Sequence, residues 1–449
     1  MKTFLRIVAG LVVFGIVALL AFIFVPVQRT APAQALAADW QAAVGQGEYV
    51  MRAGDCVACH SADGGAFLAG GSPIESPLGK IWSRNITPDV KTGIGGWSLD
   101  EFRAVMIDGI RPNGTHLYPA MPYENYRLMH EEDIAALYDY LMNEVEPVNN
   151  TVKETELSFP LNLRWGIRAW NWLALTHGPG FVVAGASDMQ DRGQYLVEGP
   201  GHCAACHSPR TVFMTQDGVM HGEENFLAGG VINDWNAHAL AGSGSVVSDW
   251  TVAETAEFLA TGRNTHAAAN GEMGLVVEHS LQYLTDEDNI AIAAYLKGED
   301  GAATGILDTD ALYVSLPQEP ADEAGLATAE MLTEASPDIN LGARLYLDNC
   351  SACHFVTGQG GPQIFPPLAG NPLVTGTQTT PLISIILHGG ELPSTQLRPM
   401  HLVMQGYADR LDDAEVAELA SFLRSAWGND ASTVSSPEVA AVRASGAEH

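Results

Sequence analysis

The chain has 449 residues and is strongly acidic, with 53 Asp plus Glu against 22 Lys plus Arg and a net charge of −31 at pH 7. This charge excludes nucleic acid as a partner, because a phosphate backbone repels an acidic surface. The length is typical of about three domains. The acidity fits either a solvated, salt-adapted surface or a dedicated acidic docking face.

An uncharged apolar run at 7–25 follows Lys2 and Arg6. The run is long enough to cross a bilayer, and the basic residues on its short side place that end in the cytoplasm. Residues 33–35 read Ala-Gln-Ala, a pattern typical of a signal-peptide cleavage site. The segment 1–38 is therefore predicted to be either a retained membrane anchor or a removed signal peptide. In both cases the rest of the chain is exported to the periplasmic side.

Every cysteine in the chain belongs to one of three copies of the pattern Cys-x-x-Cys-His, the signature of covalent haem attachment. Cysteines three apart lie on one side of a helical turn, where both form thioethers to the haem vinyl groups. The histidine that follows turns its ring toward the iron as the proximal ligand. The sequence thus predicts three covalently bound haem c groups. The attachment cysteines are Cys56, Cys59, Cys203, Cys206, Cys350 and Cys353, and the proximal histidines are His60, His207 and His354.

Other uses of paired cysteines explain the pattern less well. A disulfide across two intervening residues is strained and does not require the histidine, although it would suit an exported protein. A thioredoxin-like redox pair belongs in a βαβ context, which the flanking sequence lacks. A zinc site needs two further Cys or His ligands at regular spacing. We therefore interpret all three motifs as haem sites.

Alignment of the chain on its haem motifs shows a threefold internal repeat. A short amphipathic helix is expected before each motif and a glycine-rich loop after it, and each unit closes with a helix that starts on an acidic turn. Helices are also expected after Trp97 and Trp250, with Ser98 and Thr251 as their caps. In a class I cytochrome c the closing helix packs across the first one. The expected first and closing helices lie at 47–50 and 130–141, 193–196 and 285–296, and 342–345 and 412–423.

The predicted fold is mainly α-helical, with three tandem class I cytochrome c domains after the N-terminal membrane anchor or signal peptide. An exposed linker is expected where Ala, Pro and acidic residues dominate, and disorder is expected at the C-terminus. The expected segments are 1–38 (anchor or signal peptide), 39–150 (domain 1), 151–186 (aromatic connector), 187–299 (domain 2), 300–337 (linker), 338–429 (domain 3) and 430–449 (disordered tail).

The distal haem ligand is predicted to be methionine, which raises the potential of an electron-transfer haem. Each repeat has such a residue shortly before its closing helix, namely Met121, Met273 and Met404. In the third repeat Met400 is an alternative to Met404. Ligation by two histidines is less favoured, because the remaining histidines do not recur at one offset between repeats.

Between Asp39 and Asn429 the chain resembles the triple-haem cytochrome c subunits of membrane-bound bacterial dehydrogenases that oxidise alcohols, gluconate, sorbitol or aldehydes. The stretches that carry the resemblance are 84–88, 191–199, 201–210 and 425–429. In the first of them, Arg84 and Asn85 are expected either to hydrogen-bond haem propionates or to form a plain surface turn. The chain departs from the family pattern at Gln405, where a proline is usual, and at Asp409, where an aromatic residue is expected.

The resemblance implies an electron relay without catalytic residues of its own. A catalytic dehydrogenase subunit (quinoprotein, flavoprotein or molybdenum enzyme) would oxidise the substrate, and the haems would pass the electrons to ubiquinone at the periplasmic face of the inner membrane. Three six-coordinate haems leave no open iron position for chemistry. The alternatives are a cytochrome that donates electrons to a terminal oxidase and a multi-haem peroxidase. The tryptophans of the connector fit either inter-domain packing or contact with the membrane or the catalytic subunit.

Overall fold

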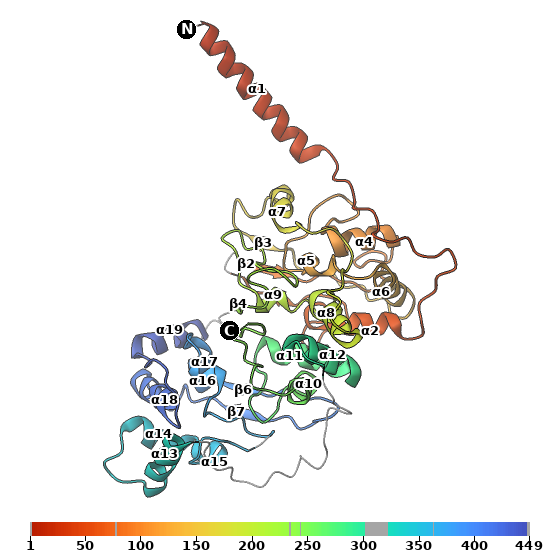
Figure 1. Ribbon diagram of the computed structural model, residues 1–449. Helices are drawn as coiled ribbons and strands as arrows, with labels where there is room; N and C mark the ends of the chain where they lie inside the picture. The colour runs from red at the N-terminus through yellow and green to blue at the C-terminus, as the bar shows by residue number, and fades with distance from the viewer. Residues whose placement is uncertain are drawn as a thin grey trace.

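The computed structural model describes residues 2–76, 79–232, 235–242, 244–300, 322–361 and 363–446. Helix α1 (Lys2–Phe24) projects from a body built mainly of short helices (Figure 1). Of the helices in the described residues, only α1 is long and apolar enough to cross a membrane. The predictions of a mainly helical chain and of an N-terminal apolar helix are therefore confirmed.

The first part of the body pairs two crossing helices with a small antiparallel sheet of order β1-β2-β3. In this sheet Ile74 pairs with Ile81, and Gly79 pairs with Leu157. Its elements are α2 (Gln46–Ala53), α3 (Cys56–His60), β1 (Pro73–Ile74), β2 (Gly79–Trp82), α4 (Leu99–Asp108), α5 (Tyr123–Tyr126), α6 (Glu131–Asn143) and β3 (Glu156–Leu157). A 3₁₀ turn η1 (Arg164–Gly166) and α7 (Ile167–Ala174) follow in the connector.

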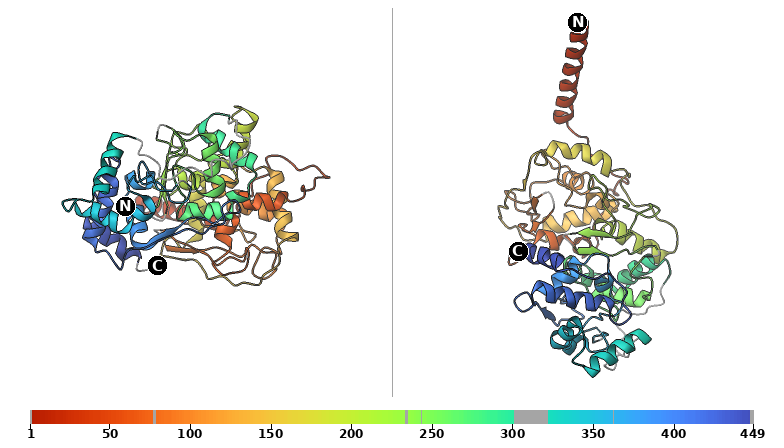
Figure 2. Two further views of the ribbon diagram at one scale, coloured as in Figure 1. Left: turned by 90° about the horizontal axis from the view of Figure 1, so that it is seen from below. Right: turned by 90° about the vertical axis from the view of Figure 1, so that its left-hand side faces the viewer.

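The second and third parts repeat this plan, each with a two-stranded antiparallel sheet. The second consists of α8 (Asp188–Glu198), α9 (Ala204–His207), β4 (Gly230–Ile232), β5 (Trp235–Ala237), α10 (Val252–Thr261), α11 (Glu272–His279), η2 (Leu281–Tyr283) and α12 (Asp286–Lys297). The third consists of α13 (Glu323–Glu334), α14 (Leu341–Asn349), α15 (Ser351–His354), α16 (Pro372–Thr375), α17 (Thr380–His388), β6 (Gly389–Glu391), β7 (Val403–Gln405), α18 (Asp413–Ser425) and α19 (Ser436–Gly446). This third part lies at the end of the body away from α1 (Figures 1 and 2).

In each part the helix before the haem motif crosses the closing helix, as α2 does with α6, α8 with α12 and α14 with α18. A glycine sits at every crossing, because there is no room for a side chain: a Cβ on Gly47, Gly193 or Gly342 would lie within 2.4 Å of a carbonyl oxygen of the facing helix. The facing helix presents an aromatic residue at the same place each time, either Tyr or Phe. The expected crossing of first and last helices is thus present in all three parts.

The predicted helix starts are confirmed by their capping boxes. The Ser98 hydroxyl accepts a hydrogen bond from the Glu101 amide, and the Glu101 carboxylate accepts one from the Ser98 amide. Thr251 and Glu254 repeat this exchange at the start of α10. Each box gives partners to amides that the helix itself leaves unbonded.

The first two parts are joined by a reciprocal pair of hydrogen bonds. The Tyr49 hydroxyl on α2 donates to Asp288 on α12, and the Tyr195 hydroxyl on α8 donates to Asp133 on α6, at 2.5 Å in the second case. The two tyrosines occupy the same position in their helices, two residues after the crossing glycine. The same surface of each part therefore contacts the other, as in a two-fold interface.

The alkaline stability of this interface is expected to depend on Tyr49. Burial, followed by the hydrogen bond to Asp288, raises the pKa of Tyr49 from 10.0 to about 12. The folded chain favours the neutral phenol, so its stabilisation is complete below pH 10 and is lost as the pH rises toward 12. Between about pH 9 and about pH 11 the native chain should lose about 1 kcal/mol more unfolding free energy than Tyr49→Phe. Urea unfolding at the two pH values measures this, and equal losses would contradict it.

The third part attaches to the second through the segment between β6 and β7. The Arg398 guanidinium forms a buried ion pair with Glu257 at 2.6 Å, and the Ser394 amide donates to Glu278 at 2.7 Å. Arg344 stands where the other two parts carry their interface tyrosine, and its guanidinium donates to the Pro337 carbonyl at 2.7 Å. The third part therefore uses a different surface.

Two segments expected to lack regular structure are partly helical, which corrects those expectations. Helix α13 lies inside the expected linker 300–337 and buries Leu332 in the third core; residues 301–321 of that linker lie outside the described residues. Helix α19 lies inside the expected disordered tail 430–449 and buries Val439 in the same core. The apolar residues of these short helices are too few for a clear periodic pattern. Helix α19 is ordered by packing on α17 and α18, and α13 by the burial of Leu332 in the third core.

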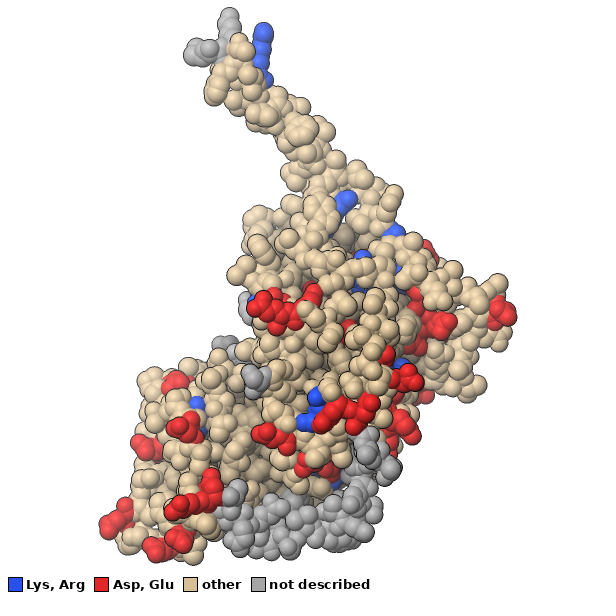
Figure 3. All heavy atoms as spheres, viewed as in Figure 1, with Lys and Arg blue, Asp and Glu red and all other residues tan. Residues whose placement is uncertain are grey.

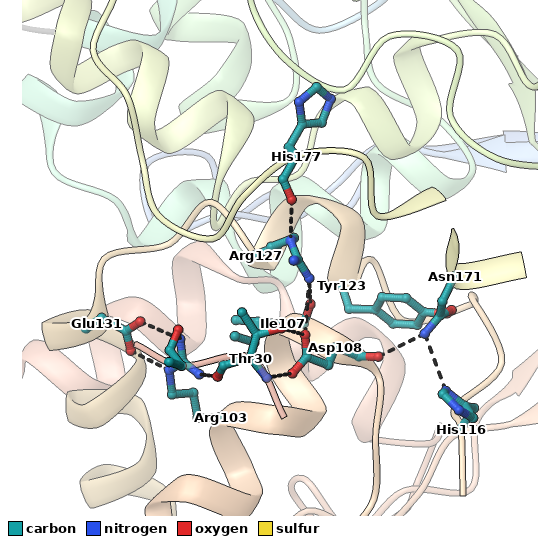
Figure 4. A network of polar contacts seen from close by, with 11 residues as sticks. Thr30, Arg103, Ile107, Asp108, His116, Tyr123, Arg127, Glu131, Asn171 and His177 are labelled. Atoms are coloured by element: carbon teal, nitrogen blue, oxygen red, sulfur yellow. Dashed lines mark hydrogen bonds and ion pairs between the residues drawn. The ribbon is translucent and has the colours of Figure 1, made fainter. Parts of the chain in front are cut away.

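The segment that follows α1 is fixed to the first part by a polar network (Figure 4). The Thr30 amide and hydroxyl donate to Asp108 at 2.8 and 2.6 Å, and the Arg103 guanidinium donates to the Thr30 carbonyl. Arg103 also forms an ion pair with Glu131 at 2.7 Å, and the Ala33 amide donates to the same carboxylate at 3.0 Å. The side chains of Arg103, Asp108 and Glu131 are all at least nine-tenths buried.

Candidate haem-attachment sites

Each Cys-x-x-Cys-His motif forms a single helical turn. Helix α3 contains the first motif entirely, and α9 and α15 each begin one residue after the first cysteine of their motif. The structure therefore brings each cysteine pair and its histidine together on one short helix, as the spacing predicts. All six sulfur atoms are free of disulfide bonds.

The three motif histidines share one hydrogen-bond pattern. Ring Nδ1 lies 2.6 Å from the Arg84 carbonyl oxygen in His60, 2.7 Å from the His238 carbonyl in His207 and 3.0 Å from the Pro366 carbonyl in His354. A carbonyl oxygen only accepts, so Nδ1 carries the hydrogen and Nε2 of the neutral ring keeps its lone pair. This arrangement fixes the ring and leaves Nε2 as the metal-binding atom.

Burial keeps the histidines neutral, as a metal ligand must be. It lowers the pKa of His60 and His354, and it lowers that of His207 to about 4. The same cause raises the pKa of several motif thiols to about 12, including Cys56 and Cys203. These surroundings disfavour the thiolate that a zinc site needs and suit an uncharged thioether sulfur. The chemistry of the donor set therefore fits haem c.

The predicted distal methionines lie beside the core of their own part. Met121 precedes α5 and packs on the first core, and Met273 lies in the first turn of α11 and packs on the second. Met404 lies in β7 and packs on the third core, whereas Met400 is 67% exposed.

The carbonyl groups that hold the histidines are functional groups that sequence reasoning missed. Arg84 was expected to bind a propionate or to lie in a surface turn, yet its guanidinium pairs with Glu154 at 2.6 Å and its carbonyl holds His60. Asn85 is buried, accepts from the amide and hydroxyl of Thr87, and donates to the Val148 carbonyl at 2.7 Å. Asn85 thus fixes the loop behind His60. A backbone acceptor has no residue signature, although this stretch did stand out in the sequence.

The first two motifs are neighbours in space. Helix α3, with the first motif, contacts α11, the helix of Met273. The Tyr126 hydroxyl donates to the Gly54 carbonyl at 2.7 Å, and the Tyr126 ring packs edge-on against His202, the residue before Cys203. A continuous path of packed groups therefore joins the two motif helices.

The geometry of these sites defines a c-type cytochrome, and the Cytochrome c family matches residues 44–144 and 339–427. The chain is 40% identical to the gluconate 2-dehydrogenase cytochrome c subunit of Pantoea cypripedii, over 90% of each chain. It is 40% identical to the alcohol dehydrogenase (quinone) cytochrome c subunit of Komagataeibacter europaeus, over 93% of this chain and 87% of the relative. It is 34% identical to the fructose dehydrogenase cytochrome subunit of Gluconobacter japonicus, over 96% and 88%. The chain belongs to the family of cytochrome c subunits of alcohol, gluconate and fructose dehydrogenases.

Proposed function

We propose that this chain is a triple-haem electron relay that carries electrons from a periplasmic dehydrogenase subunit to ubiquinone in the inner membrane. The observation that carries the proposal is the shared arrangement of His60, His207 and His354, each with Nδ1–H donated to a backbone carbonyl. Three tandem class I cytochrome c domains, at 39–150, 187–299 and 338–429, would each attach one haem. The repeated glycine at each helix crossing supports this division.

The bound haem supplies reversible one-electron transfer at its iron. The chain holds each proximal ring in one orientation through the backbone carbonyls and keeps the ring neutral by burial. It also packs the first motif helix against α11, the helix of Met273 in the second part, and a close approach of the first two sites favours successive electron transfer. We assign no catalytic residue to the chain, and the substrate is selected by the partner subunit.

We propose Met121, Met273 and Met404 as the distal ligands. The third assignment is supported by the packing of Met404 on the third core, whereas Met400 is 67% exposed. Met404→Leu should abolish the weak far-red absorption of methionine-ligated ferric haem at one site and lower one reduction potential. Absorption spectra and potentiometric titration measure both effects.

Met400→Leu is the matched control for this prediction, because it makes the same replacement four residues earlier. It should leave the spectrum and all three potentials unchanged. The reverse outcome, with the loss in Met400→Leu and not in Met404→Leu, would contradict the assignment.

We propose that α1 is retained as a membrane anchor. Cleavage after Ala35 would remove Thr30 and Ala33, and so would take partners from the buried side chains of Arg103, Asp108 and Glu131 (Figure 4). The ion pairs Arg103–Glu131 and Asp108–Arg127 would remain, but each buried polar group that loses a hydrogen-bond partner costs about 1–3 kcal/mol. The same retention places the haem domains on the periplasmic face, since Lys2 and Arg6 favour the cytoplasm.

The function is tested by isolating the complex from membranes and counting its haem with an alkaline pyridine assay. Three haems per chain, a co-purified dehydrogenase subunit and substrate-dependent reduction of a ubiquinone analogue are expected. Haem reduction without quinone reduction, together with electron transfer to a co-purified oxidase, would contradict the proposed direction. Rapid carbon monoxide binding to a ferrous haem would contradict a pure relay, because it requires an open or exchangeable iron position.

A further inference from the structure

The aromatic connector carries an exposed apolar surface at the base of α1. Helix α7 lies crosswise at the foot of α1 (Figure 2), with Asn171 and Ala174 turned into the body and Trp172 and Leu173 outward at 67% and 52% exposed. Trp165, just before this helix, is 38% exposed. The outward side of α7 is therefore apolar and largely exposed.

A second apolar group adjoins this helix. The loop after the second haem motif presents Val212 at 92% and Phe213 at 62% exposed, with Met214 beside them. The Trp170 indole N–H donates to the Phe213 carbonyl at 2.8 Å, so the loop is tied to α7. We define the connector surface as Trp165, Trp172, Leu173, Val212, Phe213 and Met214.

This surface is continuous with the candidate membrane span. The Phe22 ring near the end of α1 makes edge contacts with Trp165 and Trp172, at centroid distances of 6.2 and 5.2 Å. The Arg168 guanidinium donates to the carbonyls of Phe22 and Val25 at 2.6 and 2.8 Å, which gives partners to two carbonyls at the C-terminal end of α1. Tryptophan at the point where a span leaves the hydrocarbon is typical of the lipid interface.

Charge separates this region from the rest of the chain. Despite a net charge of −31, the sequence has no Asp or Glu within 2–38, 157–187 or 199–216. These segments contain α1, the connector with α7, and the 212–214 loop. On the face in Figure 3, acidic side chains lie mainly on the parts of the body farther from α1. An anionic lipid surface repels acids and attracts Arg, so this distribution favours a bilayer as the occupant.

We propose that the connector surface lies in the headgroup region of the lipid bilayer that α1 spans, with α7 parallel to the membrane plane. Amphipathic helices of this kind bury their apolar side at the boundary between headgroups and acyl chains. The second haem motif ends four residues before the loop begins at Thr211. The contact therefore holds this motif close to the membrane surface. The inference rests on the proposed membrane placement of α1 and adds a second membrane contact beside it.

The test places a nitroxide on Val212→Cys in the full-length holoprotein, in nanodiscs of phosphatidylethanolamine and phosphatidylglycerol. The native cysteines are bonded to haem in that protein, so the introduced thiol alone takes the label. The control is Val403→Cys in β7, a valine 61% exposed in the third part, which lies away from α1 (Figure 1). Oxygen, which partitions into lipid, should relax the label at 212 several-fold more effectively than a water-soluble nickel chelate. At 403 the order should reverse.

Equal access of the nickel chelate to positions 212 and 403 would overturn the proposal. So would a label at 212 that is exposed to the chelate in nanodiscs and shielded only after a dehydrogenase subunit is added, because the surface would then be a protein interface. Quinone reduction by the same samples separates the two hypotheses. If quinone is reduced while the label at position 212 lies in water, only the membrane contact is contradicted. If the label lies in lipid but quinone is not reduced, only the proposed function is contradicted.

Discussion

Alanine in place of Gly193 is expected to destabilise the second part of the body by about 3 kcal/mol or more. The added Cβ would lie 1.9 Å from the Ala291 carbonyl oxygen and 2.8 Å from the Tyr295 Cβ, so α8 and α12 would have to separate. Both helices carry the core of that part, and α8 leads directly into the second haem motif. Urea unfolding followed by circular dichroism should show a lower midpoint, and the yield of haem at that motif should fall.

Gly166→Ala is the matched control for this prediction. Gly166 has a helical backbone, with φ of −63°, and a Cβ there would meet no atom within 4 Å. The same chemical change should leave the unfolding midpoint within about 0.5 kcal/mol of the parent chain. A similarly small effect at position 193 would show that the helix crossing tolerates a methyl group, against the close-packing argument.

The repeat was predictable because its signals are local. Cys-x-x-Cys-His demands one helical turn, and Ser98 with Glu101 forms the capping box that starts α4. The closing helices were predictable for the same reason, from their acidic first turns and apolar spacing. Gly193 stood out as part of the repeat, but only the structure explains why a glycine is required there.

The contacts between parts could not be predicted from the sequence. The reciprocal bonds of Tyr49 and Tyr195 join residues 239 and 62 positions apart, and nothing in the local sequence marks an aspartate as the partner. The acceptors of the three motif histidines are backbone carbonyls, so residue type carries no information about them. Helix α19 escaped prediction because Val439 gains its stability from packing on the third core.

The second large effect on stability is expected from the substitution Asp108→Ala in the buried polar network next to α1. The Asp108 carboxylate accepts from the amide and hydroxyl of Thr30 and forms an ion pair with Arg127 at 3.1 Å. The side chains of both charged residues are only 6% and 11% exposed. Asp108→Ala leaves the Arg127 guanidinium without this carboxylate and removes two of the hydrogen bonds that hold the segment after α1. Removing one member of a buried pair costs about 3–5 kcal/mol, so the urea midpoint should fall markedly.

Asp100→Ala removes the same charge from an exposed pair and serves as the control. Asp100 lies 3.1 Å from Arg29, with its side chain 68% exposed, and such a pair contributes at most about 1 kcal/mol. Trypsin should cut after Arg29 several-fold faster in Asp108→Ala than in Asp100→Ala, as intact mass measures, because only the first variant loses the bonds to Thr30. Equal cleavage rates and equal unfolding midpoints would show that the bonds between Thr30 and Asp108 do not fix this segment, and would remove that part of the structural argument for a retained anchor.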